Sequence, residues 1–378
     1  MQFREFGKTG EMVSALGYGC MRFPVVGGDS AKIDEGEAIA QLRYAIDKGI
    51  DYIDTAWPYH GGNSETVVGK ALRDGYREKV KLATKLPAWA VRKHEDMDGF
   101  LNKQREKLQT DVIDFYLVHC LNEAFWANMK KHDVFSFLER AKADGRIRYA
   151  GFSFHDRQPL FMEILDAYDW DFCQIQYNFM DEDFQAGRAG LDAAAKKGIG
   201  VVVMEPLRGG RLVKNVPDDI MAIWDSAAVK RSPAAWSLRY IWNHPGVSTV
   251  LSGMGRIEEI DENISISEDA LPGLMTEEEL SVIAKVRAVY DARTLVGCTS
   301  CGYCMPCPYG VNIPKCFVNL NNGAVYNSFE WAKRHYQTFM PEESFASKCT
   351  ECGECEEKCP QQIEIRKSLK LVVEKLEG

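Results

Sequence analysis

The sequence lacks an excess of positive charge, because 46 lysine and arginine residues stand against 55 aspartate and glutamate residues, a formal net charge of -9. Proteins that bind nucleic acid neutralise phosphates with basic residues, so we expect no nucleic-acid partner. No apolar run reaches about 18 residues, the length of a membrane-spanning helix, so we expect no membrane partner. The first residues, MQFRE, are too polar for a secretory signal, and we expect a cytoplasmic protein.

Cysteine is scarce in most of the chain. Before residue 290 it occurs as Cys20, Cys120 and Cys173, whereas the rest of the 12 cysteines fall between residues 298 and 359. Scattered cysteines are usually small buried hydrophobic residues. Clustered thiols in a reducing compartment predict metal binding rather than disulfides. The length of 378 residues fits a barrel of about 250–290 residues followed by a small domain.

Strand-like and helix-like segments alternate over residues 1 to 290. Alternating units of this kind form parallel sheets, and eight of them close most naturally into a barrel, so we predict an α/β fold with a (β/α)8 TIM barrel. The alternative is an open doubly wound sheet, but GYGCMR at residues 17–22 lacks the third glycine of its phosphate loop. The predicted strands are 13–20, 51–54, 80–85, 112–119, 147–153, 172–176, 199–204 and 247–252.

Three predicted strands end in polar side chains, Asp54, Lys85 and His119, and Tyr59 follows Asp54 in the next loop. The C-terminal ends of barrel strands form the rim where active sites lie. Taken singly, such residues are more often a helix cap, a solvated lysine or a buried histidine. Taken together, they suit carbonyl reduction, with Tyr59 as general acid. We predict that Lys85 lowers the tyrosine pKa from about 10, that Asp54 holds Lys85, and that His119 orients the carbonyl.

The order of these four residues resembles the aldo-keto reductase superfamily. GFS at residues 151–153 and Gln174 extend the resemblance, which covers residues 1–290. The cysteine-rich remainder resembles a ferredoxin-type module of mostly helical character. The combination resembles the bacterial subfamily of aldo-keto reductases with a C-terminal 4Fe-4S domain. The resemblance implies a reductase barrel at 1–290, an iron–sulfur domain at 291–378, and reduction of a small or medium carbonyl compound by NAD(P)H.

The resemblance also implies where the cofactor binds. Ser153 and Gln174 would hydrogen-bond the nicotinamide carboxamide. Further cofactor residues would follow the seventh and eighth strands, namely Met204, Pro206, Leu207 and Gly209, and then Ser252, Gly253, Met254, Arg256, Glu262 and Asn263. In the last group Arg256 stands among several acids, which favours NAD over NADP and leaves Glu262 and Asn263 to contact adenine. These acids fit a solvated helix face equally well.

Some positions near the expected pocket depart from the family pattern or allow two interpretations. Phe154 and His155 follow Ser153 where many relatives have asparagine, and Met204 stands where a stacking tyrosine is usual. A thioether packs on a ring with less specificity than an aromatic side chain. The rim loops also contain tryptophans that indicate either an aromatic pocket wall or a packed lid, namely Trp57, Trp89 and Trp126.

Two cysteine runs predict two 4Fe-4S clusters. Thiolates spaced C-x2-C-x2-C reach three corners of one cubane, and a fourth cysteine followed by proline typically ligates the other cluster. The predicted ligand sets are Cys298, Cys301, Cys304 and Cys359 for one cluster, and Cys307, Cys349, Cys352 and Cys355 for the other. The first run has two residues rather than three before Cys307, so Cys316 is an alternative ligand. Two four-cysteine zinc sites are the other alternative.

Two functions fit these features. The first is a reductase whose clusters either pass electrons from a ferredoxin or staple the C-terminal segment to the barrel. Nicotinamide passes electrons in pairs and a cluster passes them singly, and we find no flavin motif that would convert between them. The second function is an iron–sulfur electron-transfer protein whose barrel is a docking scaffold. The complete set of four rim residues favours the reductase.

Overall fold

The computed structural model describes residues 1–298, 302, 304–359 and 361–378. The chain divides into two compact units. The first comprises Met1–Leu212 and Arg231–Thr276, and the second comprises Val213–Lys230 and Glu277–Gly378. The chain therefore leaves the first unit at residue 213 and returns at residue 231 before it enters its C-terminal part. A functional domain boundary at residue 290 stays a prediction.

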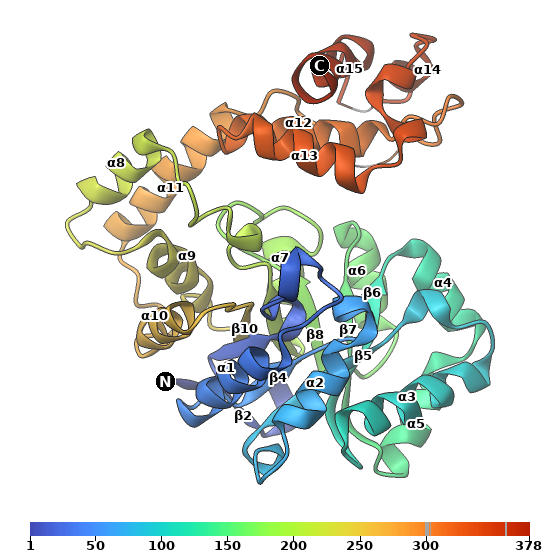
Figure 1. Cartoon of the computed structure of the whole chain (residues 1–378), viewed down its shortest axis with the longest axis vertical. Helices are drawn as coiled ribbons and strands as arrows, with labels where there is room; N and C mark the ends of the chain where they lie inside the picture. Colours follow the sequence, from blue (N-terminus) through green and yellow to red (C-terminus); the bar gives the residue numbers. More distant parts are fainter. Residues whose placement is uncertain (299–301, 303, 360) are drawn as a thin grey trace. The chain divides into compact units, whose positions relative to one another are not determined.

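The first unit is a closed barrel of parallel strands (Figure 1), as the sequence predicts. Neighbouring strands follow the order of the chain, and the last strand pairs with the first. Continuous apolar runs suit strands whose two faces are both buried. The strands are β3 (Leu16–Gly19), β4 (Tyr52–Asp54), β5 (Lys81–Leu86), β6 (Ile113–Leu121), β7 (Ile147–Phe154), β8 (Phe172–Gln176), β9 (Gly200–Met204) and β10 (Val247–Ser252).

Helices follow the strands around the barrel. Helix α1 (Glu35–Asp47) begins at Asp34, whose carboxylate caps the helix by accepting a 3.2 Å hydrogen bond from the backbone of Glu37. Helix α9 (Pro233–Trp242) begins with a proline, which suits the first turn because that position needs no N–H. The other helices are α2 (Ser64–Ala71), α3 (His94–Leu108), α4 (Glu123–Lys131), α5 (Val134–Ala143), α6 (Gln158–Asp166), α7 (Gly187–Lys196) and α10 (Ile257–Ser267).

A short hairpin precedes the barrel and fills its N-terminal end. Strands β1 (Phe3–Glu5) and β2 (Met12–Ser14) pair in antiparallel fashion. Between them, the ring of Phe6 lies 4.4 Å from Phe115, 5.5 Å from Phe172 and 5.7 Å from Tyr52, measured between ring centroids. All four rings are buried, and each phenylalanine side chain contributes about 1.5–3 kcal/mol by burial. Hydrocarbon therefore closes this end of the barrel and leaves the C-terminal rim for chemistry.

The second unit is mostly helical, as predicted. Helix α8 (Asp218–Ser226) lies in the segment that interrupts the barrel and packs against α11 (Glu277–Ala292). Arg293 joins the two by donating to both carboxylate oxygens of Asp219, at 2.6 and 2.7 Å. The remaining helices are α12 (Ile313–Val325), α13 (Phe329–Phe339), α14 (Glu354–Glu357), α15 (Ile365–Val372) and a π-helical turn (Val373–Glu377). Within the described residues, no helix combines the length and apolarity needed to cross a membrane.

Candidate active site and cysteine centres

The four residues predicted for catalysis meet at the C-terminal rim of the barrel. Asp54 is the last residue of β4, and Lys85 lies one residue before the end of β5. His119 lies near the end of β6, and Tyr59 begins a 3-10 turn shortly after β4. Because β4, β5 and β6 are parallel neighbours, their C-terminal ends reach the same rim. The four side chains are thus gathered at one place on the rim.

Lys85 is the centre of this group. Its Nζ atom donates to Asp54 Oδ1 and to the backbone carbonyl of Thr55, both at 2.7 Å, and lies 3.5 Å from the Tyr59 hydroxyl. The Lys85 side chain is fully buried, and that of Asp54 is 3 % exposed. An ammonium has three N–H groups, and these partners account for all of them. Sequence analysis missed Thr55, because a backbone carbonyl leaves no trace in residue type.

A buried polar network supports the backbone of Lys85. Glu65 on α2 accepts hydrogen bonds from Thr84 at 2.8 Å and from Gln104 at 2.7 Å. Gln104 on α3 also donates to the carbonyl of Lys85 at 2.9 Å. Lys107 Nζ lies 3.4 Å from Glu65, so the buried carboxylate has a counter-charge. Sequence analysis missed this network, because glutamate and glutamine on a helix usually face solvent.

Burial and neighbouring charges oppose one another at this site. Burial alone would lower the pKa of Lys85, but Asp54 and Tyr59 outweigh it, and the pKa of Lys85 is raised. Burial raises the pKa of Asp54, and the Lys85 ammonium offsets part of that rise. Burial also raises the pKa of Tyr59, although Lys85 acts in the opposite direction. Lys85 therefore acts on the pKa of Tyr59 in the predicted direction, but the net shift is upward, because desolvation of the phenolate is the larger effect.

His119 is a neutral imidazole near neutral pH. Burial lowers its pKa well below the usual range, and the charges of Lys85 and His155 lower it further. The rings of Trp89 and Tyr59 lie 5.1 and 6.2 Å from the imidazole. The buried Nδ1 atom of His119 has no hydrogen-bond partner in the described part of the chain. Because an unpaired buried polar atom costs free energy, this nitrogen suits contact with a bound molecule.

One of the three tryptophans expected near the pocket reaches the catalytic residues. Trp89 lies beside His119 and 6.2 Å from Phe125, so it forms an aromatic wall there. The ring of Trp57 packs on Phe100 at 5.0 Å. Trp126 is buried, and its Nε1 atom donates to Glu163 at 2.7 Å. The interpretation as a pocket wall thus applies to Trp89, whereas Trp57 and Trp126 pack against helices.

The residues expected at the nicotinamide lie together on β7, β8 and β9. Ser153 pairs in register with Gln174, and Gln174 Nε2 lies 3.5 Å from Met204 Sδ. Gln174 is buried, and its Oε1 atom has no hydrogen-bond partner among the described residues. Ser153 Oγ accepts from the backbone of Cys120 at 2.7 Å, which leaves its O–H group to donate. A carboxamide offers both a donor and an acceptor, so these side chains fit a nicotinamide.

Asp181 anchors the loop after β9. Arg208 donates to both of its carboxylate oxygens, at 2.6 and 3.0 Å. Asn178 donates to Asp181 at 2.7 Å and to the carbonyl of Glu205 at 3.1 Å. Asp181 is 2 % exposed, and a bidentate pair of this kind fixes geometry as well as adding stability. The anchored loop contains the predicted cofactor residues Pro206, Leu207 and Gly209. Sequence analysis missed Asp181, which lies 27 residues before Arg208.

The polar residues after β10 bond to other protein groups. Asn263 on α10 is buried and donates to Ser252 Oγ at 3.0 Å. Glu262 accepts a hydrogen bond from Ser232 at 2.7 Å. Asn263 therefore orders the start of this segment rather than presenting a free amide. Contact of Glu262 and Asn263 with adenine stays a prediction.

Arg256, a predicted cofactor residue in this segment, pairs with an acid. The Arg256 side chain is 68 % exposed, and its Nη2 atom lies 3.2 Å from Glu259. Glu259 also accepts from the backbone N–H of Gly255 at 3.0 Å, so it holds the loop. Met254, another predicted cofactor residue, is buried. The charge of Arg256 is thus partly balanced by the protein itself.

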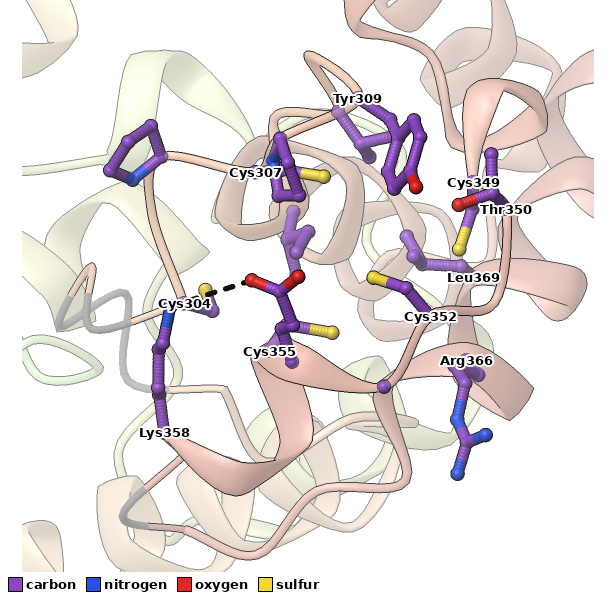
Figure 2. Close-up of a pocket in the computed structure, with 16 residues that line it drawn as sticks. Cys304, Cys307, Tyr309, Cys349, Thr350, Cys352, Cys355, Lys358, Arg366 and Leu369 are labelled. Atoms are coloured by element: carbon purple, nitrogen blue, oxygen red, sulfur yellow. Dashed lines mark ion pairs between the residues drawn. The ribbon is translucent and has the colours of Figure 1, made fainter.

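Cysteines from both runs line a hollow in the second unit (Figure 2). The thiols that line it are those of Cys304, Cys307, Cys349, Cys352 and Cys355. The last four form one predicted ligand set. No three donor side chains in the described parts of the chain converge closely enough to hold a single metal ion. The thiols of this set nevertheless line one hollow, as ligands of one cluster would.

A second hollow is lined by Cys298, Cys304 and Cys359. These are three of the four ligands predicted for the other cluster. The fourth, Cys301, lies outside the described residues. Each hollow contains thiols from both cysteine runs, which agrees with the exchange of the fourth ligand between clusters.

Cys316 has a different environment. It is fully buried on α12, where its sulfur lies 3.7 Å from the Tyr336 hydroxyl. Burial raises its pKa to about 12, which disfavours the thiolate that binds metal. Cys316 lines neither hollow, whereas Cys307 lines the first. The geometry therefore favours Cys307 over Cys316 as a ligand.

Two family profiles match the sequence. The profile of the Aldo/keto reductase family matches residues 15–283, and that of a 4Fe-4S dicluster domain matches residues 297–364. The first match covers well over half of the chain. This chain belongs to the aldo/keto reductase family. It is an NAD(P)H-dependent oxidoreductase with a 4Fe-4S domain.

Relatives of this aldo/keto reductase span its barrel. L-galactose dehydrogenase of Arabidopsis thaliana is 27% identical over 320 residues, which cover 76% of this chain and 94% of that protein. Probable aldo-keto reductase 1 of Glycine max is 26% identical, over 76% of this chain and 89% of the relative. The holo form of an aldo-keto reductase from Bacillus halodurans has a TM-score of 0.64 and 27% identity, over 76% of this chain and 96% of its own. An aldo/keto reductase from Klebsiella pneumoniae in complex with NADP and acetate has a TM-score of 0.60 and 26% identity, over 75% and 95%.

Proposed function

We propose that this aldo/keto reductase reduces a small or medium carbonyl compound with NAD(P)H and that Tyr59 donates the proton. The observation that carries the proposal is the buried Lys85 ammonium, which binds Asp54 and lies 3.5 Å from the Tyr59 hydroxyl. The bound cofactor supplies a hydride. Reduction of the carbonyl then needs one proton on its oxygen. Tyr59 holds that proton near neutral pH, because burial raises its pKa.

The other three residues assist Tyr59 in distinct ways. When the phenol gives up its proton, the Lys85 ammonium stabilises the phenolate that remains. Asp54 keeps Lys85 charged although Lys85 is fully buried. His119 is neutral, because burial lowers its pKa, so it orients a carbonyl oxygen by hydrogen bonding and does not compete with Tyr59 as a proton donor.

The substitution Tyr59→Phe tests this role, because it removes the hydroxyl and keeps the ring. We expect kcat/KM to fall by about 10²–10⁴, the usual contribution of general acid catalysis, while the Kd for the cofactor stays unchanged. Tyr76→Phe is a matched control, since the Tyr76 hydroxyl bonds to Asp47 at 2.8 Å on the protein surface. The assay is a screen of carbonyl compounds with NADH and NADPH under anoxic conditions. Normal turnover by Tyr59→Phe would disprove the role.

Two observations bear on the preference between NAD and NADP, and the first is the charge of the segment after β10. Arg256 is balanced by Glu259, and this supports use of NAD. The relative from Klebsiella pneumoniae is in complex with NADP, and this supports use of NADP. Quenching of tryptophan fluorescence by each dinucleotide gives the two Kd values. If neither binds the wild-type protein, an electron-transfer protein with a scaffold barrel replaces the reductase as the better interpretation.

We further propose that the C-terminal unit binds two 4Fe-4S clusters. Cys307, Cys349, Cys352 and Cys355 would hold one, and Cys298, Cys301, Cys304 and Cys359 the other. The observation in favour is that thiols of both runs line each hollow. An iron content of about eight per chain supports two clusters, and about four supports one. Bound zinc, without broad absorbance at roughly 400 nm, would contradict the presence of either one or two iron–sulfur clusters.

The clusters either pass electrons from a ferredoxin partner or stabilise the second unit. Anaerobic titration of the reduced clusters with the oxidised dinucleotide separates these roles. Reoxidation of the clusters would support electron transfer between cluster and cofactor. Failure to reoxidise would remove direct transfer and favour a stabilising role.

A further inference from the structure

Arg22 lies at the rim of the barrel and has no part in the catalytic group described above. It ends a 3-10 turn, Cys20–Arg22, that follows β3. Its side chain runs between the loop after β10 and the loop after β9. A Cβ atom built on Gly253 would lie 3.0 Å from Arg22 Cδ, and one built on Gly209 would lie 2.9 Å from Arg22 Nη2. The stem of Arg22 therefore lies against Gly253, and its guanidinium lies beside Gly209.

Both glycines leave room for this side chain. Gly209 has a φ of +67° and thus adopts the left-handed conformation that favours glycine. Gly253 has no such backbone requirement. A Cβ atom at Gly253 would instead lie 3.0 to 3.2 Å from three stem carbons of Arg22, which is closer than ordinary van der Waals contact. Close approach of Arg22 therefore explains the glycine at residue 253.

The charge of Arg22 is available to a ligand. Among the residues that the structure describes, Arg22 forms no hydrogen bond or ion pair through its guanidinium. Arg208 and Arg256, on the two neighbouring loops, each pair with a carboxylate. Glu205 Oε2 lies 3.7 Å from the same Cβ position on Gly209, yet it is not paired with Arg22. The exposed Arg22 side chain is thus placed by packing, and no carboxylate among the described residues pairs with it.

We propose that Arg22 binds the pyrophosphate of the nicotinamide dinucleotide. The inference rests on the proposed function, because it requires a dinucleotide at this rim. Gln174 on β8 marks the nicotinamide end, and Asn263 on α10 marks the expected adenosine end. The two glycine loops lie between these ends in the order of the barrel. A guanidinium donates two parallel N–H groups to a phosphate. Arg22 therefore supplies the positive charge that the acidic segment after β10 lacks.

Binding measurements on the full-length protein test this role without an activity assay. We compare Arg22→Ala and Arg22→Met with the wild type by fluorescence titration with NADH, NADPH and ADP-ribose. Methionine keeps an apolar stem against Gly253 and removes the charge. We expect both variants to raise the Kd for all three ligands by the same factor. That factor should be about ten- to a hundredfold, as for loss of a charge-assisted hydrogen bond. Arg22→Lys should recover part of the affinity, because lysine keeps the charge without the fork.

Arg148→Ala is the matched control, since Arg148 lies at the N-terminal end of β7 with its side chain 60% exposed. We expect its affinities to match those of the wild type. Loss of affinity limited to NADPH would place Arg22 at the 2′-phosphate and overturn the proposal. Wild-type affinity in Arg22→Met would make Arg22 a packing residue and also overturn it. If the wild type binds none of the ligands, the proposed function itself fails.

Discussion

Removal of one partner from the Lys85–Asp54 pair should destabilise the barrel more than removal of both. The two charged atoms are 2.7 Å apart, and their side chains are 0% and 3% exposed, so water cannot replace a lost partner. Breaking such a pair costs about 3–5 kcal/mol, whereas replacing both partners with apolar groups is often neutral. We expect Lys85→Met and Asp54→Leu each to lower the free energy of unfolding by about 3–5 kcal/mol. The double variant should lose about 1–3 kcal/mol, because the Thr55 carbonyl loses its donor.

Thermal unfolding of the barrel, followed by its buried tryptophans, gives the measurement. At roughly 2 °C for each kcal/mol, the single variants should melt about 6–10 °C below the wild type. The matched control is Lys81→Met, because Lys81 pairs with Asp51 at the same 2.7 Å but with side chains 24% and 13% exposed. That variant should lose about 1 kcal/mol or less. Single variants that melt within about 2 °C of the wild type would show that breaking the buried pair costs little. A double variant whose loss of stability equals the sum of the two single losses would show that the two residues do not act as a pair.

Two further predictions concern titration and the clusters. Because burial lowers the pKa of His119, its contribution to stability is present above the unfolded pKa of about 6.5 and is lost as pH falls through the folded value; an imidazole titration seen by NMR near 6.5 would contradict this. The substitution Cys307→Ser should remove about half of the iron and of the absorbance near 400 nm, whereas Cys316→Ser should keep both. Equal losses in the two variants would contradict the ligand sets.

The local pattern of apolar and polar residues was sufficient to predict most strands of the barrel. Strands β8 and β10 have the bounds that the sequence predicts. The strand predicted at residues 13–20 instead divides, because Met12–Ser14 joins the hairpin and Leu16–Gly19 joins the barrel. A continuous apolar run shows that residues are buried but does not show which sheet each half joins. The packing of α8 on α11 could not be predicted from the sequence either, because the two helices lie far apart in the chain.

The site was predictable where function depends on residue type at a strand end. Asp54, Lys85 and His119 lie at or near the C-terminal ends of neighbouring strands, so their convergence follows from a parallel barrel. Arg22 and Asp181 were missed, because a polar residue on a loop reveals its partners only after folding. The direction of the Tyr59 pKa shift was missed for a related reason. Residue types indicate that a cation is near, but they do not indicate how much water the fold excludes.

Exclusion of water explains why these residues act as one unit. Burial raises the pKa of Tyr59, so the resting phenol keeps the proton it must donate. The same exclusion strengthens the ammonium's effect on a phenolate, since two charges about 4 Å apart interact by about 1 kcal/mol in water and about 4 kcal/mol at an effective dielectric constant near 20. A buried lysine without a partner would lose its own proton. Asp54 therefore keeps the buried Lys85 charged. The charged Lys85 in turn stabilises the phenolate that Tyr59 forms when it donates its proton.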